Sequence, residues 1–394
     1  MPWKETDKMD QVHQFIAAVR KGEKPFKHIC DDFGISEKTG YKWKNRAIAC
    51  GEKSLGELSR RPKNSPTQIN SEVLAEMIRI KNAYKTWGPK KVLARYKAIY
   101  PNKEAPSLSS VERHFRIAGL VKTRRVKKAA ISDCPRLQRQ IKANAPNDVW
   151  CIDFKGYWIS GGERCEPFTI RDLYSKKIIR VQLVASKDTE TIREIMKSAF
   201  REFGLPKVIH SDNGTPFACS SGVLGLTALS VWWISLGIIP DRSLKGCPGQ
   251  NGSLERFHAD IAAEIEKKIP GGIEANQRAL DEWVKEYNSV RPNEAIGMKT
   301  PDEIYVKSER KYIGDYDEIE YPIGYISRKG QHNGTIKVHG AVIRIGYAFK
   351  GYQLGLKPIA DADGVYAYDV FLCDFPLGKL DIKTGCFSQF DEVK

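Results

Sequence analysis

The chain has 394 residues, of which 41% are hydrophobic and 28% charged, a composition that is typical of folded domains and excludes a largely disordered protein. No apolar run approaches the roughly 20 residues needed to span a membrane, and the first residues lack the apolar core of a signal peptide. We therefore expect a cytoplasmic protein of two to four domains with no membrane partner.

The net charge of +16 lies entirely in the first third of the chain. Residues 1–130 carry 29 Lys and Arg against 13 Asp and Glu, whereas basic and acidic residues are equal in number over residues 131–394. A basic excess of this size attracts the phosphate backbone of nucleic acids regardless of base sequence. Solubility, or binding to an acidic protein, is the weaker alternative.

Residues 11–46 have the pattern of a helix-turn-helix domain. A first segment with apolar residues at helical spacing is followed by a second segment that Gly34 ends and a third that Ser36 caps. The alternative is a plain three-helix bundle with a solvated basic face. On the first interpretation, the third helix offers donors to bases and phosphates from Lys38, Thr39, Lys42, Lys44 and Arg46.

A turn-rich basic linker follows at residues 55–66. Its Arg60 and Arg61 could follow a DNA backbone or minor groove, or could equally be solvated charges. We assign residues 1–64 to a first DNA-binding domain.

Residues 65–130 repeat this organisation, with two amphipathic helices and then the sequence Ser109-x-x-Glu112. That sequence predicts a capping box that opens a third helix, which Gly119 ends. A basic run follows the helix and is expected to bind the DNA backbone. The candidate DNA contacts of this second helix-turn-helix domain are Ser110, Arg113, His114, Arg116, Arg124 and Arg125.

From residue 147 the pattern changes to strands. Three β-rich runs are expected at 149–159, 165–171 and 177–184, followed by a helix at 188–203 and a fourth strand at 205–210. This order predicts an α/β domain that begins with a meander.

Three carboxylates in this region could converge on a metal ion. Asp153 lies in an apolar run, where an unpaired carboxylate would be costly. Asp212 follows a short buried strand and precedes an Asn-Gly turn, and Glu255 lies in the first turn of an expected helix. We interpret the competing Asp172 and Asp188 as a strand-end turn residue and a helix cap.

Together, Asp153, Asp212-Asn-Gly and Gln250-Asn-Gly-x-x-Glu255 resemble the catalytic core of the retroviral-integrase superfamily. The chain is most similar to bacterial insertion-sequence transposases of the DDE type, whose helix-turn-helix domains precede the core. The resemblance implies a ribonuclease-H-like α/β core at residues 145–310, in which the three acids are catalytic and hold two Mg²⁺ ions, with Mn²⁺ able to substitute.

The resemblance also implies that the loop before Glu255 contacts DNA, through Lys245, Gln250 and Asn251. Arg256 and His258 could orient a phosphate or a metal-bound water. The later Glu264 and Glu266 are alternative acids, which we interpret as part of a solvated helix face. Arg291, in a closing motif of the family, is expected to brace the core or to meet DNA.

The sequence departs from the family in its spacing and in its cysteines. Between Asp212 and Glu255 lie 42 residues, more than in many relatives, and the extra length falls in the loop-like segment 215–227. Asn293 stands where the family's closing motif usually has His. The nine cysteines form no Cys-x-x-Cys or Cys-His cluster, so the zinc module of retroviral integrases is absent.

Beyond residue 321, short β-prone runs at regular spacing predict a small five-stranded barrel over residues 321–394. By similarity this is an SH3-like barrel that assists DNA binding or assembly. The predicted fold is therefore multidomain α/β, with all-α helix-turn-helix domains, a ribonuclease-H-like core and a C-terminal β-barrel.

The resemblance implies a transposase that binds the ends of its element, cuts the 3′ strands and joins them to target DNA. Its expected partners are double-stranded DNA and further copies of itself, as a homodimer or larger oligomer on DNA, in the bacterial nucleoid. The alternative is a DNA-binding regulator with an inactive integrase-like domain. A structure-selective nuclease without a joining step is a third, weaker reading.

Overall fold

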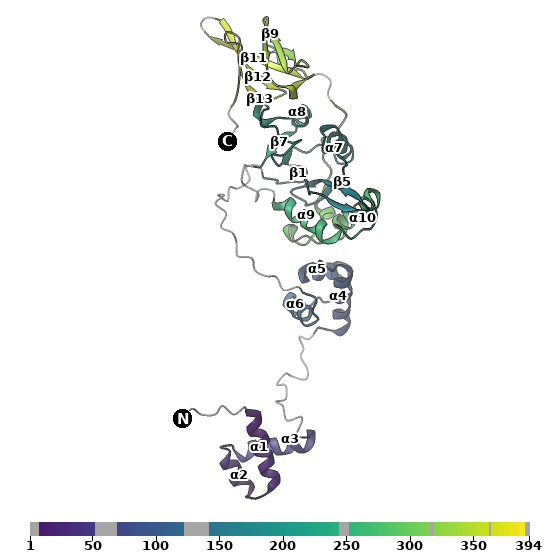
Figure 1. Cartoon of the computed structure of the whole chain (residues 1–394), viewed down its shortest axis with the longest axis vertical. Helices are drawn as coiled ribbons and strands as arrows, with labels where there is room; N and C mark the ends of the chain where they lie inside the picture. Colours follow the sequence, from purple (N-terminus) through teal and green to yellow (C-terminus); the bar gives the residue numbers. More distant parts are fainter. Residues whose placement is uncertain are drawn as a thin grey trace. The chain divides into compact units, whose positions relative to one another are not determined.

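The computed structural model describes residues 8–51, 69–121, 142–243, 252–315, 319–361 and 364–390. The chain divides into two compact units, Met1–Gln68 and Ile69–Lys394, whose parts are coloured along the sequence in Figure 1. None of the helices in the described ranges is long and apolar enough to cross a membrane.

The first unit is a three-helix fold of α1 (Lys8–Lys21), α2 (Phe26–Asp32) and α3 (Glu37–Cys50). Its core includes Phe15, Ile29 and Trp43, all less than 9% exposed. The Ser36 side chain accepts a hydrogen bond from the Thr39 backbone N–H and caps α3, as predicted.

The second unit begins with another three-helix fold, formed by α4 (Ser71–Ala83), α5 (Pro89–Ile99) and α6 (Leu108–Ile117). The predicted capping box at Ser109 is wrong, because Ser107 caps α6 and accepts a hydrogen bond from the Ser110 N–H. The helix starts earlier than expected, since Leu108 packs against the buried core of this fold and extends its apolar face. Gly119 follows the end of α6 with φ +67°, a conformation that favours glycine.

A mixed five-stranded sheet of order β5-β4-β1-β6-β7 forms the centre of the second unit. Neighbouring pairs β5–β4 and β4–β1 are antiparallel, whereas β1–β6 and β6–β7 are parallel. The strands are β1 (Val149–Phe154), β4 (Pro167–Asp172), β5 (Ile178–Leu183), β6 (Val208–Ser211) and β7 (Ile239–Arg242).

The run predicted as one strand over residues 149–159 is two strands in the structure. Between β1 and β2 (Trp158–Ser160), Gly156 takes φ +90° and breaks the pleat. β2 pairs with β3 (Glu163–Cys165) in a separate hairpin outside the main sheet.

Helices cover both faces of the central sheet (Figure 1). On one face, α7 (Thr189–Phe203) and α8 (Ala228–Ser235) share a core with Trp150 and Ile152 of β1. On the other, α9 (Gly252–Glu264) and α10 (Ile273–Ser289) share a core with Val149 and Cys151. β1 is buried on both sides, as its apolar sequence predicts. The short helices η4 (Glu294–Ile296) and α11 (Pro301–Ile304) follow.

The C-terminal part contains an antiparallel sheet of order β14-β13-β12-β11-β8 and a separate β9–β10 hairpin. The core of this part also includes Leu226, Val231 and Ile234, from α8 and the segment before it. The strands are β8 (Ile326–Lys329), β9 (Thr335–Val338), β10 (Ala341–Arg344), β11 (Gln353–Asp361), β12 (Gly364–Leu372), β13 (Phe375–Asp381) and β14 (Cys386–Gln389), with η5 (Tyr347–Phe349) after β10.

Segment 215–227, where the extra length between Asp212 and Glu255 falls, contacts both the central sheet and the C-terminal part. It contains η2 (Val223–Gly225), whose Leu224 N–H donates to the Gln389 side chain at 2.9 Å. Arg242 of β7 donates to the carbonyl oxygens of Leu224 and Gly225. The added residues join the central sheet to the C-terminal part.

Candidate active site

Asp153 and Asp212 lie at the same edge of the central sheet. Asp153 is the fifth residue of β1, and Asp212 is the first residue after β6. These two strands are adjacent and parallel, with Cys151 opposite His210. The carboxyl ends of parallel strands meet at one edge, which is where open α/β sheets place their ligand sites.

Glu255 reaches this edge from α9. Leu254 and Phe257 of that helix share a buried core with Cys151 of β1. Because side chains alternate along a strand, Asp153 leaves β1 on the same face as Cys151, toward α9. Asp153 and Asp212 are half-buried, whereas Glu255 is exposed.

Asp153 lies within electrostatic range of Asp212 and Glu255. Burial, then the negative charge of Asp212 and, less strongly, that of Glu255 together raise the pKa of Asp153 to about 6. A hydrogen bond from the Phe154 N–H to its Oδ1 (2.8 Å) and the charge of Lys187 act in the opposite sense. The three carboxylates repel one another, and a bound cation would relieve that repulsion.

The turn after β6 holds the Asp212 carboxylate in place. The Gly214 N–H donates to Asp212 Oδ1 at 3.1 Å, and a Cβ at position 214 would lie 3.0 Å from Oδ2, so a glycine fits closely here. The Asn213 side chain donates to the Ser243 carbonyl at 2.5 Å, which ties the turn to the end of β7. The Asp-Asn-Gly motif thus has a local structural explanation for each residue.

The strand before this turn is fixed by a buried histidine that the sequence interpretation missed. His210 is 1% exposed, with its Nδ1 atom 2.5 Å from Asp241 Oδ2 and its Nε2 atom 3.0 Å from Ser243 Oγ. Asp241 belongs to β7, and Ser243 is the first residue after that strand. A histidine two residues before the Asp-Asn-Gly turn was the available signal.

Arg171 fixes the start of α9 and was also missed. Its guanidinium group is 4% exposed and donates to the Ser253 carbonyl at 2.8 Å, two residues before Glu255. It also donates to the Tyr287 hydroxyl at 3.2 Å. A buried arginine on β4 therefore sets where the helix that carries Glu255 begins.

His258 does not face the acids as a free group. Its Nε2 atom lies 3.0 Å from the Thr169 hydroxyl, which itself donates to the Asp153 carbonyl at 3.0 Å. Burial, and then the charges of Lys155 and Arg171, lower the pKa of His258 to about 4. The imidazole is therefore neutral near pH 7 and joins α9 to β1.

The competing acids have structural partners. Asp172 is fully buried and accepts hydrogen bonds from Ser175 and from the Asn147 N–H, and Asp188 caps α7 through Thr191, so both predicted roles are confirmed.

The predicted solvated roles of Glu264 and Glu266 are wrong, because side chains from other parts of the fold pair with both carboxylates. Glu264 accepts hydrogen bonds from Arg291, Trp283 and Thr86, and its side chain is 15% exposed. Glu266 pairs with Lys155 at 2.5 Å. Arg291 is 4% exposed and also pairs with Asp260, so it braces the core.

The predicted DNA contacts of the helical folds lie on the third helix of each. On α3, Lys38 and Lys42 are exposed, whereas Thr39, Lys44 and Arg46 are half-buried, with Arg46 stacked on Trp43. On α6, Arg113 and Arg116 are exposed, and Ser110 and His114 are half-buried. The other predicted DNA contacts fall outside the described residues, namely Arg60, Arg61, Arg124, Arg125, Lys245, Gln250 and Asn251.

The three acids suit a hard divalent ion. Their donors are carboxylate oxygens alone, the ligands that Mg²⁺ prefers. Within the described ranges, no three acidic, histidine or cysteine side chains form a group that could hold one metal ion by themselves. A pair of ions needs only two protein carboxylates for each ion, because water and phosphate oxygens can supply the remaining ligands.

Protein-family models match most of the second unit. Two models described as integrase core domain match residues 143–248 and 236–301, and together these ranges contain Asp153, Asp212 and Glu255. A model described as the C-terminal domain of IS481 family transposases matches residues 326–386.

Two bacterial relatives match part of the chain. A protein of insertion element IS407 from Burkholderia multivorans is 28% identical over 200 residues, which cover 50% of this chain and 68% of the relative. A transposase-like protein of Haemophilus influenzae is 27% identical over 157 residues, which cover 39% of this chain and 69% of the relative.

Among solved structures, the HTLV-2 integrase catalytic core domain in complex with magnesium is 15% identical, with a TM-score of 0.31, over 42% of this chain and all of that one. A chain of the simian T-cell lymphotropic virus intasome in complex with a PP2A regulatory subunit is 14% identical, with a TM-score of 0.32, over 64% of this chain and 85% of that one.

Proposed function

We propose that this chain, which belongs with the insertion-sequence transposases built on an integrase core domain, cuts the 3′ strands at the ends of its element and joins them to target DNA. The observation that carries the proposal is the convergence of three acids. Asp153 and Asp212 come from adjacent parallel strands, and α9 brings Glu255 to the same edge of the sheet.

The reaction conserves the number of phosphodiester bonds in its second step. In the first step a water oxygen attacks phosphorus and the P–O3′ bond breaks, which leaves a 3′-hydroxyl on the element end. In the second step that hydroxyl oxygen attacks a target phosphodiester, whose own P–O3′ bond breaks and whose O3′ takes the proton. No external energy source is required for either step.

Asp153 would contribute to both ion sites, with Asp212 completing one and Glu255 the other. Two bound Mg²⁺ ions, or Mn²⁺ in their place, would stabilise the negative charge that gathers around phosphorus in each step. The protein's own part is positional. Arg171 fixes the start of α9, and the Gly214 N–H orients the Asp212 carboxylate.

The two helical folds support DNA binding. In each, a serine caps the third helix, and that helix carries exposed basic side chains. We infer that they are helix-turn-helix domains that recognise the element ends, that the core has the ribonuclease-H-like fold, and that the C-terminal strands form a small barrel. Two ends must be held together, so the protein acts on DNA as a dimer or larger oligomer in the nucleoid.

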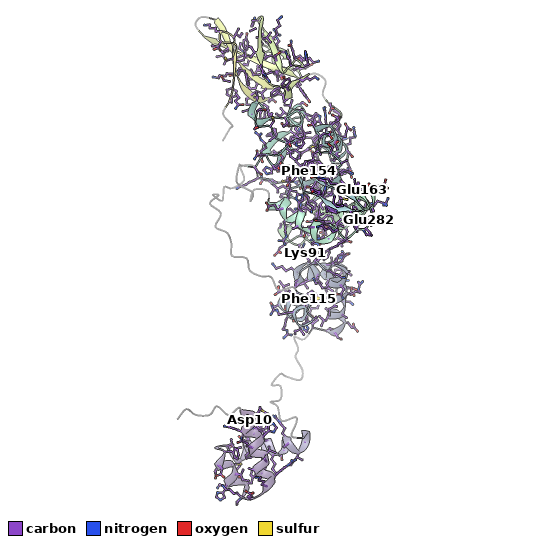
Figure 2. The ribbon with its side chains drawn as sticks, viewed as in Figure 1. Asp10, Lys91, Phe115, Phe154, Glu163 and Glu282 are labelled. Atoms are coloured by element: carbon purple, nitrogen blue, oxygen red, sulfur yellow. The ribbon has the colours of Figure 1, made fainter. Side chains whose placement is uncertain are left out.

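The experiment that tests this proposal is a cleavage assay with a duplex that spans the end of the element and its flanking DNA. Asp153→Asn and Glu255→Gln should each abolish the 3′ cut while DNA binding persists. Glu282→Gln is the matched control, because Glu282 is an exposed acid on α10 (Figure 2) that is not one of the three proposed catalytic acids. Equal cleavage by all four proteins would contradict the proposal.

A further inference from the structure

The β2–β3 hairpin carries an exposed aromatic and cationic surface immediately after the strand of Asp153. Trp158 and Cys165 face inward and are 2% exposed or less, whereas Tyr157 and Ile159 are 54% and 55% exposed. Arg164 pairs with Ile159 across the hairpin, and its guanidinium lies 3.8 Å from the centre of the Tyr157 ring. We call Tyr157, Ile159 and Arg164 the hairpin face; Phe154 and Glu163, labelled in Figure 2, are near it in the chain.

A buried carboxylate connects the hairpin face to the three acids. Glu166 is 5% exposed, and one of its oxygens accepts hydrogen bonds from Arg164 at 2.8 and 3.1 Å. Its other oxygen lies 2.5 Å from the ammonium group of Lys187. Lys187 in turn lies over the Phe154 ring at 4.6 Å and acts electrostatically on Asp153.

This arrangement leaves positive charge beside the acids. Although burial by itself raises the pKa of Glu166, the hydrogen bonds from Lys187 and Arg164 bring it below its ordinary value, so the group is ionised. Two cations then share one anion, which leaves an excess of one positive charge. The Lys187 and Arg164 side chains are 43% and 53% exposed, so both remain open to an anionic ligand.

We propose that the hairpin face binds an unpaired nucleotide of the DNA strand next to the cleaved phosphodiester, with its base stacked on Tyr157 and Arg164 and its phosphate near Lys187. This inference rests on the proposed function for its ligand. A flat ring with a stacked guanidinium suits the face of a base, and bases within a duplex are already stacked on one another. The hairpin face should therefore bind a DNA end with unpaired nucleotides in preference to a fully paired, blunt end.

The test measures binding and not catalysis. The full-length protein, in Ca²⁺ in place of Mg²⁺, is titrated against two fluorescent duplexes of the element's end, one blunt and one with a short unpaired tail. The intact protein should bind the tailed duplex about tenfold more tightly, the size expected for one stacked base. Tyr157→Ala should lose this preference and keep its affinity for the blunt duplex.

Two further variants separate stacking from folding. Tyr157→Phe should retain the preference, because the ring remains. Arg164→Lys should lose part of it, because lysine can keep the ion pair with Glu166 but cannot stack. Tyr174→Ala is the matched control, since Tyr174 is a 40% exposed tyrosine that follows β4 at the opposite end of β1 from Asp153.

The outcomes distinguish this inference from the proposed function. An unchanged tail preference in Tyr157→Ala, in a protein that cuts and joins DNA, would overturn the inference alone. A preference that Tyr157→Ala loses, in a protein that never cuts, would support the nucleotide site and overturn the transposase. Fewer protein copies per DNA in Tyr157→Ala, with the preference unchanged, would assign the face to a second copy and overturn the inference.

Discussion

Thr169 in β4 lies directly opposite Asp153 in β1, and its hydroxyl group donates a hydrogen bond to the Asp153 carbonyl at 3.0 Å. Because the hydroxyl has one hydrogen, the Thr169 oxygen must accept its second bond from Nε2 of His258, which therefore carries the hydrogen. His258 follows Glu255 by three residues on α9. One threonine thus connects the elements that carry two of the three acids.

Thr169→Val should slow strand cleavage without weakening DNA binding. Valine keeps the shape of the side chain and removes both hydrogen bonds, so α9 and β1 lose a fixed contact. A small displacement of catalytic groups costs about 10- to 100-fold in rate. Single-turnover cleavage rates measure the effect, and Thr169→Ser should restore most of the rate. A normal rate in Thr169→Val would show that this contact does not position the acids.

The buried state of His258 should make stability fall in mildly acidic solution. Its pKa is about 4 in the folded protein and near 6.5 when exposed, so the unfolded chain binds more protons between these values. The contribution of His258 is complete above pH 6.5 and is lost as the pH falls toward 4, at up to about 1.4 kcal/mol per pH unit. Melting temperatures of the intact protein should therefore fall more steeply over this range than those of His258→Gln. If the melting temperatures of the two proteins fell equally with pH, the low pKa of His258 in the folded protein would be contradicted.

Glu264→Ala should destabilise the second unit strongly. The substitution removes one of the two acids that pair with the buried Arg291. Within the described residues, only the ion pair with Asp260 then remains. Breaking a buried pair in this way costs about 3–5 kcal/mol. Thermal unfolding of the full chain measures the loss. Glu274→Ala is the control, since this 92% exposed side chain contributes little. Similar melting temperatures for the two variants would disprove the buried role of Glu264.

Leu226→Ala should loosen the C-terminal strands from α8. Leu226 is 4% exposed and shares a core with Leu354 and Val370. Truncation of a buried leucine costs about 2–5 kcal/mol. Limited proteolysis should release the C-terminal part faster in this variant than in Ile323→Ala, whose side chain is fully exposed. Equal release rates would show that the shared core contributes little.

Lys42→Gln should weaken DNA binding uniformly across base sequences if α3 contacts the backbone. Each lost phosphate contact reduces the slope of log affinity against log salt by about 0.9. Lys24→Gln is the control on the same unit, because Lys24 already pairs with Asp32 at 2.6 Å. Salt titrations of binding to the element's end compare the two. An unchanged slope in Lys42→Gln would exclude this lysine from the DNA contacts.

The sequence was sufficient to predict features with a local cause. The resemblance to insertion-sequence transposases is confirmed by the family models. The predicted meander is present as the neighbouring strands β1, β4 and β5 of the mixed sheet. The Ser36 cap and the Asp188 cap were predicted because capping depends on neighbours within three residues. The roles of Asp153, Asp212 and Glu255 stay a prediction until activity is measured.

Features that depend on packing between distant segments were missed or wrong. Glu264 has the sequence context of an exposed helix residue, and its burial depends on Thr86 and Arg291, far away in the chain. Arg171 and Thr169 lie within an apolar strand, and their contacts with α9 follow from the fold and not from spacing. The link between segment 215–227 and the C-terminal strands required the structure for the same reason.

The most direct measurement of the central claim uses a pre-cut duplex that ends in the element's own terminal sequence, incubated with a target plasmid and Mg²⁺. We predict that the intact protein joins the duplex to the plasmid, and that Asp212→Asn binds the duplex but forms no joined product. Chelation of the metal should abolish joining by the intact protein. Binding without joining in both proteins, with Mn²⁺ as well as Mg²⁺, would contradict the account and indicate a DNA-binding regulator.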